Sequence, residues 1–115
     1  MRKIYHLGSC STNQRIIKEL DLTNKNFEFQ EIKTEKITAK QLQEMKELSG
    51  SYEALFSRVA LKYKTLNPKP ATENEYKKLI LEEYTFLKRP VILLDKKIFI
   101  GNSKSTLADL QKYLL

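Results

Sequence analysis

The residues best suited to chemistry gather near the start of the chain, where HLGSCSTNQR spans residues 6–15. The only cysteine, Cys10, and the only histidine, His6, both fall in this segment. A thiol reacts as its thiolate, and an ordinary cysteine, with a pKa of about 8.5, is mostly protonated at neutral pH. We expect Cys10 at the start of a helix, where unpaired N–H groups and the helix dipole stabilise a thiolate. The same N–H groups would hold an oxyanion that arrives at the sulfur, so the segment predicts a nucleophile that acts on anions.

Arginine would supply the positive charge that such an anion needs, in a planar fork that stays protonated. The chain is rich in lysine, and its arginines are Arg2, Arg15, Arg58 and Arg89. Arg89 directly precedes Pro90, and a cis bond between them would hold the guanidinium facing the Cys10 loop. Arg58 follows a short predicted helix and could reach the same loop. We therefore expect Arg58 and Arg89 to bind the anion.

These residues also have purely structural interpretations. A lone cysteine is often a small buried apolar side chain, but the strand-to-helix position of Cys10 beside Gly and Ser residues favours reactivity. His6 is read equally well as a strand residue with a polar partner or as an electrostatic aid to the thiol. Arg15 is expected on the helix surface, and Arg58 alone would be a helix-end cation, so its interpretation depends on Arg89.

Hydrophobic periodicity and turn residues indicate the elements that position this segment. Ser9 or Ser11 is expected to cap the first helix, and Thr38 and Thr72 each begin a capping box. Residues 61–71 are expected to form a loop. The predicted inward residues are Ile16, Ile17, Leu20, Leu42, Met45, Leu48, Tyr76, Leu79, Ile80, Leu107, Leu110 and Leu114. The predicted strands are 3–7, 27–32 (with one buried face), 91–94 and 98–100, with a turn at 95–97. The predicted helices are 10–20, Thr38 to Gly50, 52–56, from Thr72, and from Ser103 to the end.

This order, βαβ, a helical block and ββα, predicts an α/β fold with one mixed four-stranded sheet. It is the thioredoxin-like arrangement with an inserted helical subdomain. We expect one domain over 1–115, with a core formed by 1–35 and 88–115 and a helical insertion at 36–87. In such folds the reactive sulfur lies between the first strand and helix, and a proline precedes the third strand, as Pro90 does here.

Composition limits the classes of function. The net charge is +7, from 21 Lys+Arg against 14 Asp+Glu, but the basic residues are scattered and form no block. We therefore expect a positively charged surface and no nucleic-acid partner. No apolar run is long enough to span a bilayer, and the start of the chain does not read as a secretory signal. A lone cysteine cannot form an internal disulfide, and without an export signal it predicts a cytoplasmic protein. We also expect a monomer without a membrane partner, a metal or a bound cofactor.

The motifs together resemble the ArsC-like family, which contains glutaredoxin-coupled arsenate reductases and the Spx regulators. The resemblance covers essentially the whole chain. The Tyr5–Thr12 segment is similar to the family's strand-loop-helix motif, including a histidine four residues before the cysteine. The other matching segments are Leu55–Arg58 with Tyr63, Lys88–Ile92 with its Arg-Pro pair, and Phe99–Gly101.

The resemblance implies an arsenate reductase mechanism. Cys10 would attack arsenate, while Arg58 and Arg89 would neutralise the oxyanion. Glutathione would attack the adduct and glutaredoxin would resolve the mixed disulfide, releasing arsenite. These external reductants are required because the chain has no second cysteine. The residues expected to contact substrate are His6, Ser11, Thr12, Asn13 and Pro90.

Two positions depart from the family pattern. Many relatives have a second cysteine where this chain has Asn13, and arsenate reductases have a third arginine where it has Asn102 and Ser103. The first departure excludes an internal redox switch, although Asn13 could donate a hydrogen bond to the sulfur. The second predicts weaker arsenate binding. Two alternatives therefore stay open: an Spx-like regulator that binds RNA polymerase, and a glutathione-dependent thiol-disulfide enzyme without arsenate activity.

Overall fold

The computed structural model describes residues 1–114, which form two compact units. The first contains Met1–Glu35 and the chain from Arg89 onward, and the second contains Lys36–Lys88. The predicted α/β class and mixed four-stranded sheet are confirmed. Within residues 1–114, no helix is long and apolar enough to cross a membrane.

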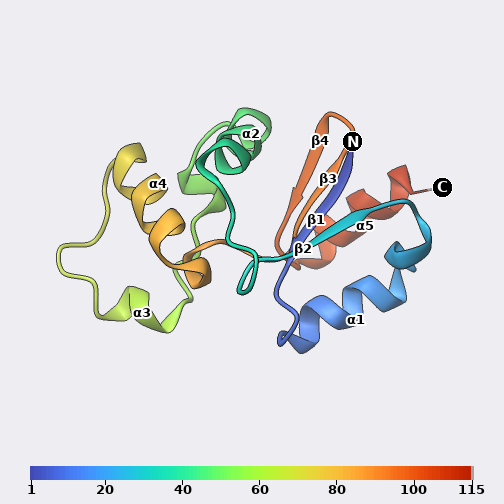
Figure 1. The fold of residues 1–115 in the computed structure, drawn as a ribbon, viewed down its shortest axis with the longest axis horizontal. Helices are drawn as coiled ribbons and strands as arrows, with labels where there is room; N and C mark the ends of the chain where they lie inside the picture. Colours follow the sequence, from blue (N-terminus) through green and yellow to red (C-terminus); the bar gives the residue numbers. More distant parts are fainter. Residues whose placement is uncertain (115) are drawn as a thin grey trace. The chain divides into compact units, whose positions relative to one another are not determined.

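The first unit contains the sheet, in the order β2-β1-β3-β4 (Figure 1). β1 is parallel to β2 and antiparallel to β3, which pairs with β4 in a hairpin. All four residues of β3 are buried, as expected for an apolar central strand. The strands are β1 (Arg2–His6), β2 (Glu28–Glu31), β3 (Val91–Leu94) and β4 (Lys97–Ile100).

Two helices, α1 (Ser11–Glu19) and α5 (Lys104–Tyr113), cover one face of this sheet (Figure 1). Ile16 of α1 and Leu110 of α5 are buried in one apolar cluster with strand residues such as Ile4 and Ile92. A short 3-10 helix, η1 (Leu22–Asn24), follows α1 and adds the fully buried Leu22. This packing fixes α1, and therefore its N-terminus, against the central strands.

The second unit is helical. Its elements are α2 (Ala39–Ser49), η2 (Glu53–Leu55), α3 (Leu61–Lys64), α4 (Glu73–Glu82) and η3 (Tyr84–Phe86). Both predicted capping boxes are present, at Thr38 with Gln41 and at Thr72 with Glu75. α2 ends at Gly50, whose φ of 97° lies in the left-handed region that favours glycine. Phe56 is fully buried, and its ring stacks on Phe86 with centroids 5.2 Å apart.

Several local predictions were wrong. Residues 61–71 were expected to form a loop, but 61–64 form the short helix α3, and residues 52–56 contain only a 3-10 turn. Leu48 was expected to point inward but is exposed. β2 does not have one buried face, because Gln30 is buried too. The turn between β3 and β4 is shorter than predicted, and Lys97 already belongs to β4.

Candidate functional site

Cys10 ends the loop that joins β1 to α1 and is the N-cap residue of this nine-residue helix. The prediction that Ser9 or Ser11 caps α1 was wrong: Cys10 holds that position, and its side chain makes no capping hydrogen bond. The Cys10 N–H donates to the Leu7 carbonyl (3.0 Å), and the Gln14 N–H donates to the Cys10 carbonyl (3.1 Å). The residue is only partly exposed. Cys10 therefore lies at the N-terminus of α1, where the first N–H groups of the helix begin.

Asn13 connects this sulfur to the loop. Its side chain is 1% exposed, and its Oδ1 accepts the Leu7 N–H at 2.9 Å. That bond directs the amide nitrogen the other way, and Nδ2 donates to Cys10 Sγ at 3.4 Å. Asn13, which stands where the resemblance places a second cysteine, is thus a hydrogen-bond donor to Cys10.

Gly8, within the loop, is held from two sides. Its N–H donates to Glu31 Oε1 at 2.6 Å, and its carbonyl accepts a hydrogen bond from Gln14 Nε2. Neither Glu31 nor Gln14 was among the predicted site residues. The sequence contains only a weak signal for Glu31, because its partner lies 23 positions away.

His6, the last residue of β1, meets the Phe29 ring edge to face, with centroids 5.7 Å apart. Its Nδ1 is buried and has no hydrogen-bond partner in the described chain. Burial lowers the pKa of His6 below its usual value, although the nearby Glu31 charge opposes this shift. The imidazole is therefore mostly neutral at pH 7.

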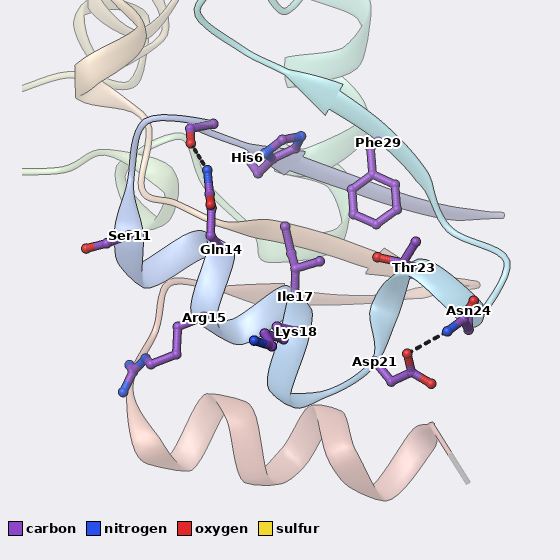
Figure 2. A pocket seen from close by; sticks show the side chains of 11 residues that line it. His6, Ser11, Gln14, Arg15, Ile17, Lys18, Asp21, Thr23, Asn24 and Phe29 are labelled. Atoms are coloured by element: carbon purple, nitrogen blue, oxygen red, sulfur yellow. Dashed lines mark hydrogen bonds between the residues drawn. The ribbon is translucent and has the colours of Figure 1, made fainter.

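An open groove of about 980 Å³ lies beside the loop, between α1 and β2 (Figure 2). His6, Phe29 and Ile17 form its apolar part, and the close view shows Gln14 bonded to the loop at one end. Its full lining is His6, Gly8, Ser11, Gln14, Arg15, Ile17, Lys18, Asp21, Thr23, Asn24 and Phe29. Arg15 is exposed, as expected from the sequence.

Pro90 precedes β3, and the Arg89–Pro90 peptide bond is cis. Antiparallel pairing places Tyr5 opposite Val91, so the start of β3 and the end of β1 share one edge of the sheet. The Pro90 carbonyl accepts the Gly101 N–H at 2.9 Å, which ties this edge to the end of β4. The fold thus brings the half-buried Arg89 and the buried Pro90 to the sheet edge from which the Cys10 loop leaves.

Arg58 belongs to the second unit. Its Nη2 lies 2.8 Å from Glu53 Oε2 and donates to the Tyr76 hydroxyl at 2.8 Å. The hydrogen bond to Glu53 raises the pKa of this guanidinium above its usual value. The guanidinium also lies over the Tyr76 ring, 5.5 Å from its centroid. A carboxylate and a tyrosine thus fix the position of Arg58.

The remaining predicted residues lie in the first unit. Ser11, the first residue of α1, is exposed, and Thr12 is half-buried. Ser103 occupies the N-cap of α5, where its side chain accepts the Thr106 N–H. Of Asn102 and Ser103, the two residues at which the resemblance places a third arginine, Ser103 thus stabilises a helix terminus. Among residues 1–114, no group of three or more His, Cys, Asp or Glu side chains is arranged to hold a metal ion.

The ArsC family model matches residues 5–110 of the chain. A search of curated proteins finds no match.

Solved structures give the same fold. An arsenate reductase from Vibrio cholerae is 15% identical, with a TM-score of 0.79 over 94% of this chain and 95% of its own. An arsenate reductase related protein from Brucella melitensis is 22% identical, with a TM-score of 0.70 over 97% and 92%. A protein from Staphylococcus aureus is 23% identical, with a TM-score of 0.75 over 95% and 97%. These likenesses confirm the predicted thioredoxin-like fold.

Proposed function

Because the chain belongs to the ArsC family, we propose that it is a thiol-based oxidoreductase whose nucleophile is Cys10 and whose substrate is arsenate. Family membership supports thiol-based reduction at the level of the family. One observation carries the proposal for this chain: Cys10 Sγ lies at the N-cap of α1 and accepts a hydrogen bond from Asn13.

This position favours the thiolate over the thiol. The first N–H groups of α1 have no partners within the helix, and they add to the positive end of its dipole. The Asn13 amide donates a hydrogen bond that is stronger to an anionic sulfur than to a neutral one. Together these donors stabilise the charge that the nucleophile must carry.

The same helix terminus suits a bound oxyanion. N–H groups at the start of α1, with Ser11 and Thr12, are the proposed contacts for arsenate oxygens. Arg89, beside Pro90 at the same edge of the sheet, is the proposed cation for charge that builds up during attack. The role of Arg58 as a second cation stays a prediction that mutation tests.

The proposed reaction has three steps. The Cys10 thiolate attacks the arsenic atom and displaces one oxygen as water, which gives a thiol–arsenate adduct. The glutathione thiolate then attacks Cys10 Sγ, so that a sulfur–sulfur bond forms and the sulfur–arsenic electron pair leaves with arsenic as arsenite. Arsenic gains two electrons, and the two sulfurs become a mixed disulfide. Glutaredoxin attacks the glutathione sulfur and releases the Cys10 thiolate.

An external thiol is required because Cys10 is the only cysteine. No bound cofactor takes part in this scheme; glutathione and glutaredoxin act as diffusing reductants.

A second candidate is a glutathione-dependent thiol-disulfide enzyme without arsenate activity. The observation in its favour is Ser103, which caps α5 at the position where arsenate reductases have an arginine. This reaction needs the same reactive Cys10 but less positive charge around it.

The test measures arsenite formed from arsenate, glutathione and glutaredoxin, with a disulfide substrate assayed in parallel. The variants are Cys10→Ser, Arg89→Ala and Arg58→Ala, and Arg15→Ala is the control for loss of an exposed arginine. We expect no turnover in Cys10→Ser, a loss of about tenfold or more in Arg89→Ala, and wild-type turnover in Arg15→Ala.

Three other outcomes would refute the proposal or favour another function. Arsenite formation at the wild-type rate in Cys10→Ser would refute the proposal. Disulfide reduction without arsenite would favour the second candidate. No turnover on either substrate, together with retention of the protein on immobilised RNA polymerase, would favour an Spx-like regulator.

A further inference from the structure

We infer that Glu31 is a positioning residue for the Cys10 loop, holding the backbone before the nucleophile through the Gly8 N–H. The inference deepens the proposed function, because it rests on Cys10 being the reactive residue. Glu31 is the last residue of β2, and β2 lies parallel to β1 at the end from which the loop leaves.

Both oxygens of the Glu31 carboxylate accept hydrogen bonds from backbone N–H groups. Oε1 accepts the Gly8 N–H at 2.6 Å, while Oε2 accepts the N–H groups of Lys33 at 2.6 Å and Thr34 at 3.1 Å. One side chain thus joins the loop after β1 to the turn after β2. Hydrogen bonds from N–H groups to a charged acceptor are stronger than neutral ones, so this is a firm connection between the two segments.

Residue 8 is suited to this contact. A Cβ atom added to Gly8 would lie 3.2 Å from Glu31 Oε1, tighter than most Cβ contacts, and 3.4 Å from Glu31 Cγ. Glycine therefore leaves the room that the carboxylate needs to reach the backbone. On the other side, Gln14 holds the Gly8 carbonyl.

The connection matters for Cys10 because Gly8 is part of a short segment that several hydrogen bonds hold in place. The Leu7 N–H donates to Asn13, and the Leu7 carbonyl accepts the Cys10 N–H. Since Asn13 also donates to Cys10 Sγ, a shift of residues 7 and 8 would change the donors around the sulfur. Glu31 acts on Cys10 through this backbone and not through contact with substrate.

The experiment compares Glu31→Ala with Glu31→Gln, because both remove the same negative charge but only Gln keeps an oxygen for the Gly8 N–H. Glu35→Ala, an exposed carboxylate in the following turn, is the control for charge. Two quantities are measured: amide hydrogen exchange at Gly8 by NMR, and the rate of Cys10 alkylation by iodoacetamide at pH 7.

Glu31→Ala should accelerate Gly8 exchange by about tenfold or more, as expected for loss of a hydrogen bond to a charged acceptor. Glu31→Gln should stay closer to the wild-type exchange rate. Cys10 alkylation should be slower in Glu31→Ala than in Glu31→Gln, because a loosened loop stabilises the thiolate less. Glu35→Ala should change neither quantity.

Equal behaviour of the Ala and Gln variants, or unchanged Gly8 exchange in both, would overturn the inference. A wild-type alkylation rate no higher than that of free glutathione at pH 7 would instead count against the proposed function, and the Gly8 exchange rates would still test the role of Glu31. If Glu31→Ala does not fold, Gly8→Ala supplies the reciprocal test. It should accelerate exchange at Lys33 and Thr34, and unchanged exchange there would contradict the inference.

Discussion

Asn13 provides the sharpest test of the hydrogen bonds in the Cys10 loop, because its buried amide bonds both the loop backbone and the Cys10 sulfur. In Asn13→Ala the Leu7 N–H loses its acceptor and Cys10 Sγ loses its donor. In Asn13→Asp an oxygen can still accept the Leu7 N–H, but the group beside the sulfur becomes a carboxylate that cannot donate. The two variants therefore separate the structural bond from the bond to sulfur.

The expected loss of stability in Asn13→Ala follows from the burial of the hydrogen bond that it removes. The bond between the Leu7 N–H and Asn13 is buried, and leaving a buried N–H without a partner costs about 1–3 kcal/mol. We therefore expect Asn13→Ala to lower the free energy of unfolding by about 2 kcal/mol. In Asn13→Asp the lost donor and the added negative charge both oppose the thiolate. Iodoacetamide should therefore alkylate Asn13→Asp about tenfold more slowly than the wild type at pH 7, equivalent to about 1.4 kcal/mol.

Urea unfolding measures the loss of stability in Asn13→Ala as a lower midpoint at unchanged slope, and the iodoacetamide alkylation rate at pH 7 measures the loss of reactivity in Asn13→Asp. Asn24→Ala is the matched control, since Asn24 is exposed and its side chain donates a hydrogen bond to the nearby Asp21 side chain. It should stay within about 0.5 kcal/mol of the wild type. An unfolding free energy for Asn13→Ala equal to that of this control would refute the role assigned to Asn13.

Three further predictions concern other groups. Burial raises the pKa of Glu31, but the backbone N–H donors of Gly8, Thr34 and Lys33 outweigh this effect and lower it below its usual value. The resulting stability is present above the ordinary glutamate pKa of about 4.3 and is lost as the pH falls through the lower folded value. Unfolding measured from pH 6 to 3 should therefore depend less on pH in Glu31→Gln, and an unchanged pH dependence would contradict the assignment. The half-buried His6 imidazole should titrate below its ordinary pKa of about 6.5 when followed by NMR, so that stability falls as the pH drops from 6.5 towards the lower folded value. A His6 midpoint at or above 6.5 would be inconsistent with the burial seen here. Phe56→Ala should destabilise the protein by about 3–5 kcal/mol in a denaturation experiment, because the ring is fully buried against Phe86 and Tyr76; a loss below about 1 kcal/mol would show that this cluster contributes little.

The sequence predicts best where the signal is local. The capping boxes at Thr38 and Thr72 depend on residues three positions apart, and both are present. The apolar run at 91–94 identified the central strand β3 because such a strand is buried on both faces. Together with strand order, these signals were enough to predict the fold class.

The predictions that failed concern local structure and hydrogen-bond partners that tertiary contacts determine. Leu61 in α3 is 80% exposed, so this four-residue helix has no apolar periodicity to reveal it. The cap of α1 was assigned to a serine on propensity, but the loop hydrogen bonds place Cys10 there. Glu31 was missed because it bonds Gly8 across 23 positions, and nothing near either residue indicates the pairing.

The central claim is that Cys10 at the N-cap of α1 is stabilised as a thiolate by the helix N–H groups and by Asn13. Its most direct test is the rate at which iodoacetamide alkylates the wild-type protein at pH 7, compared with the rate for the free thiol of glutathione; this rate reports on Cys10 alone because the chain has one cysteine. We predict that Cys10 reacts faster than the free thiol, because the thiolate is the reactive form. A rate equal to or below that of the free thiol would contradict the claim.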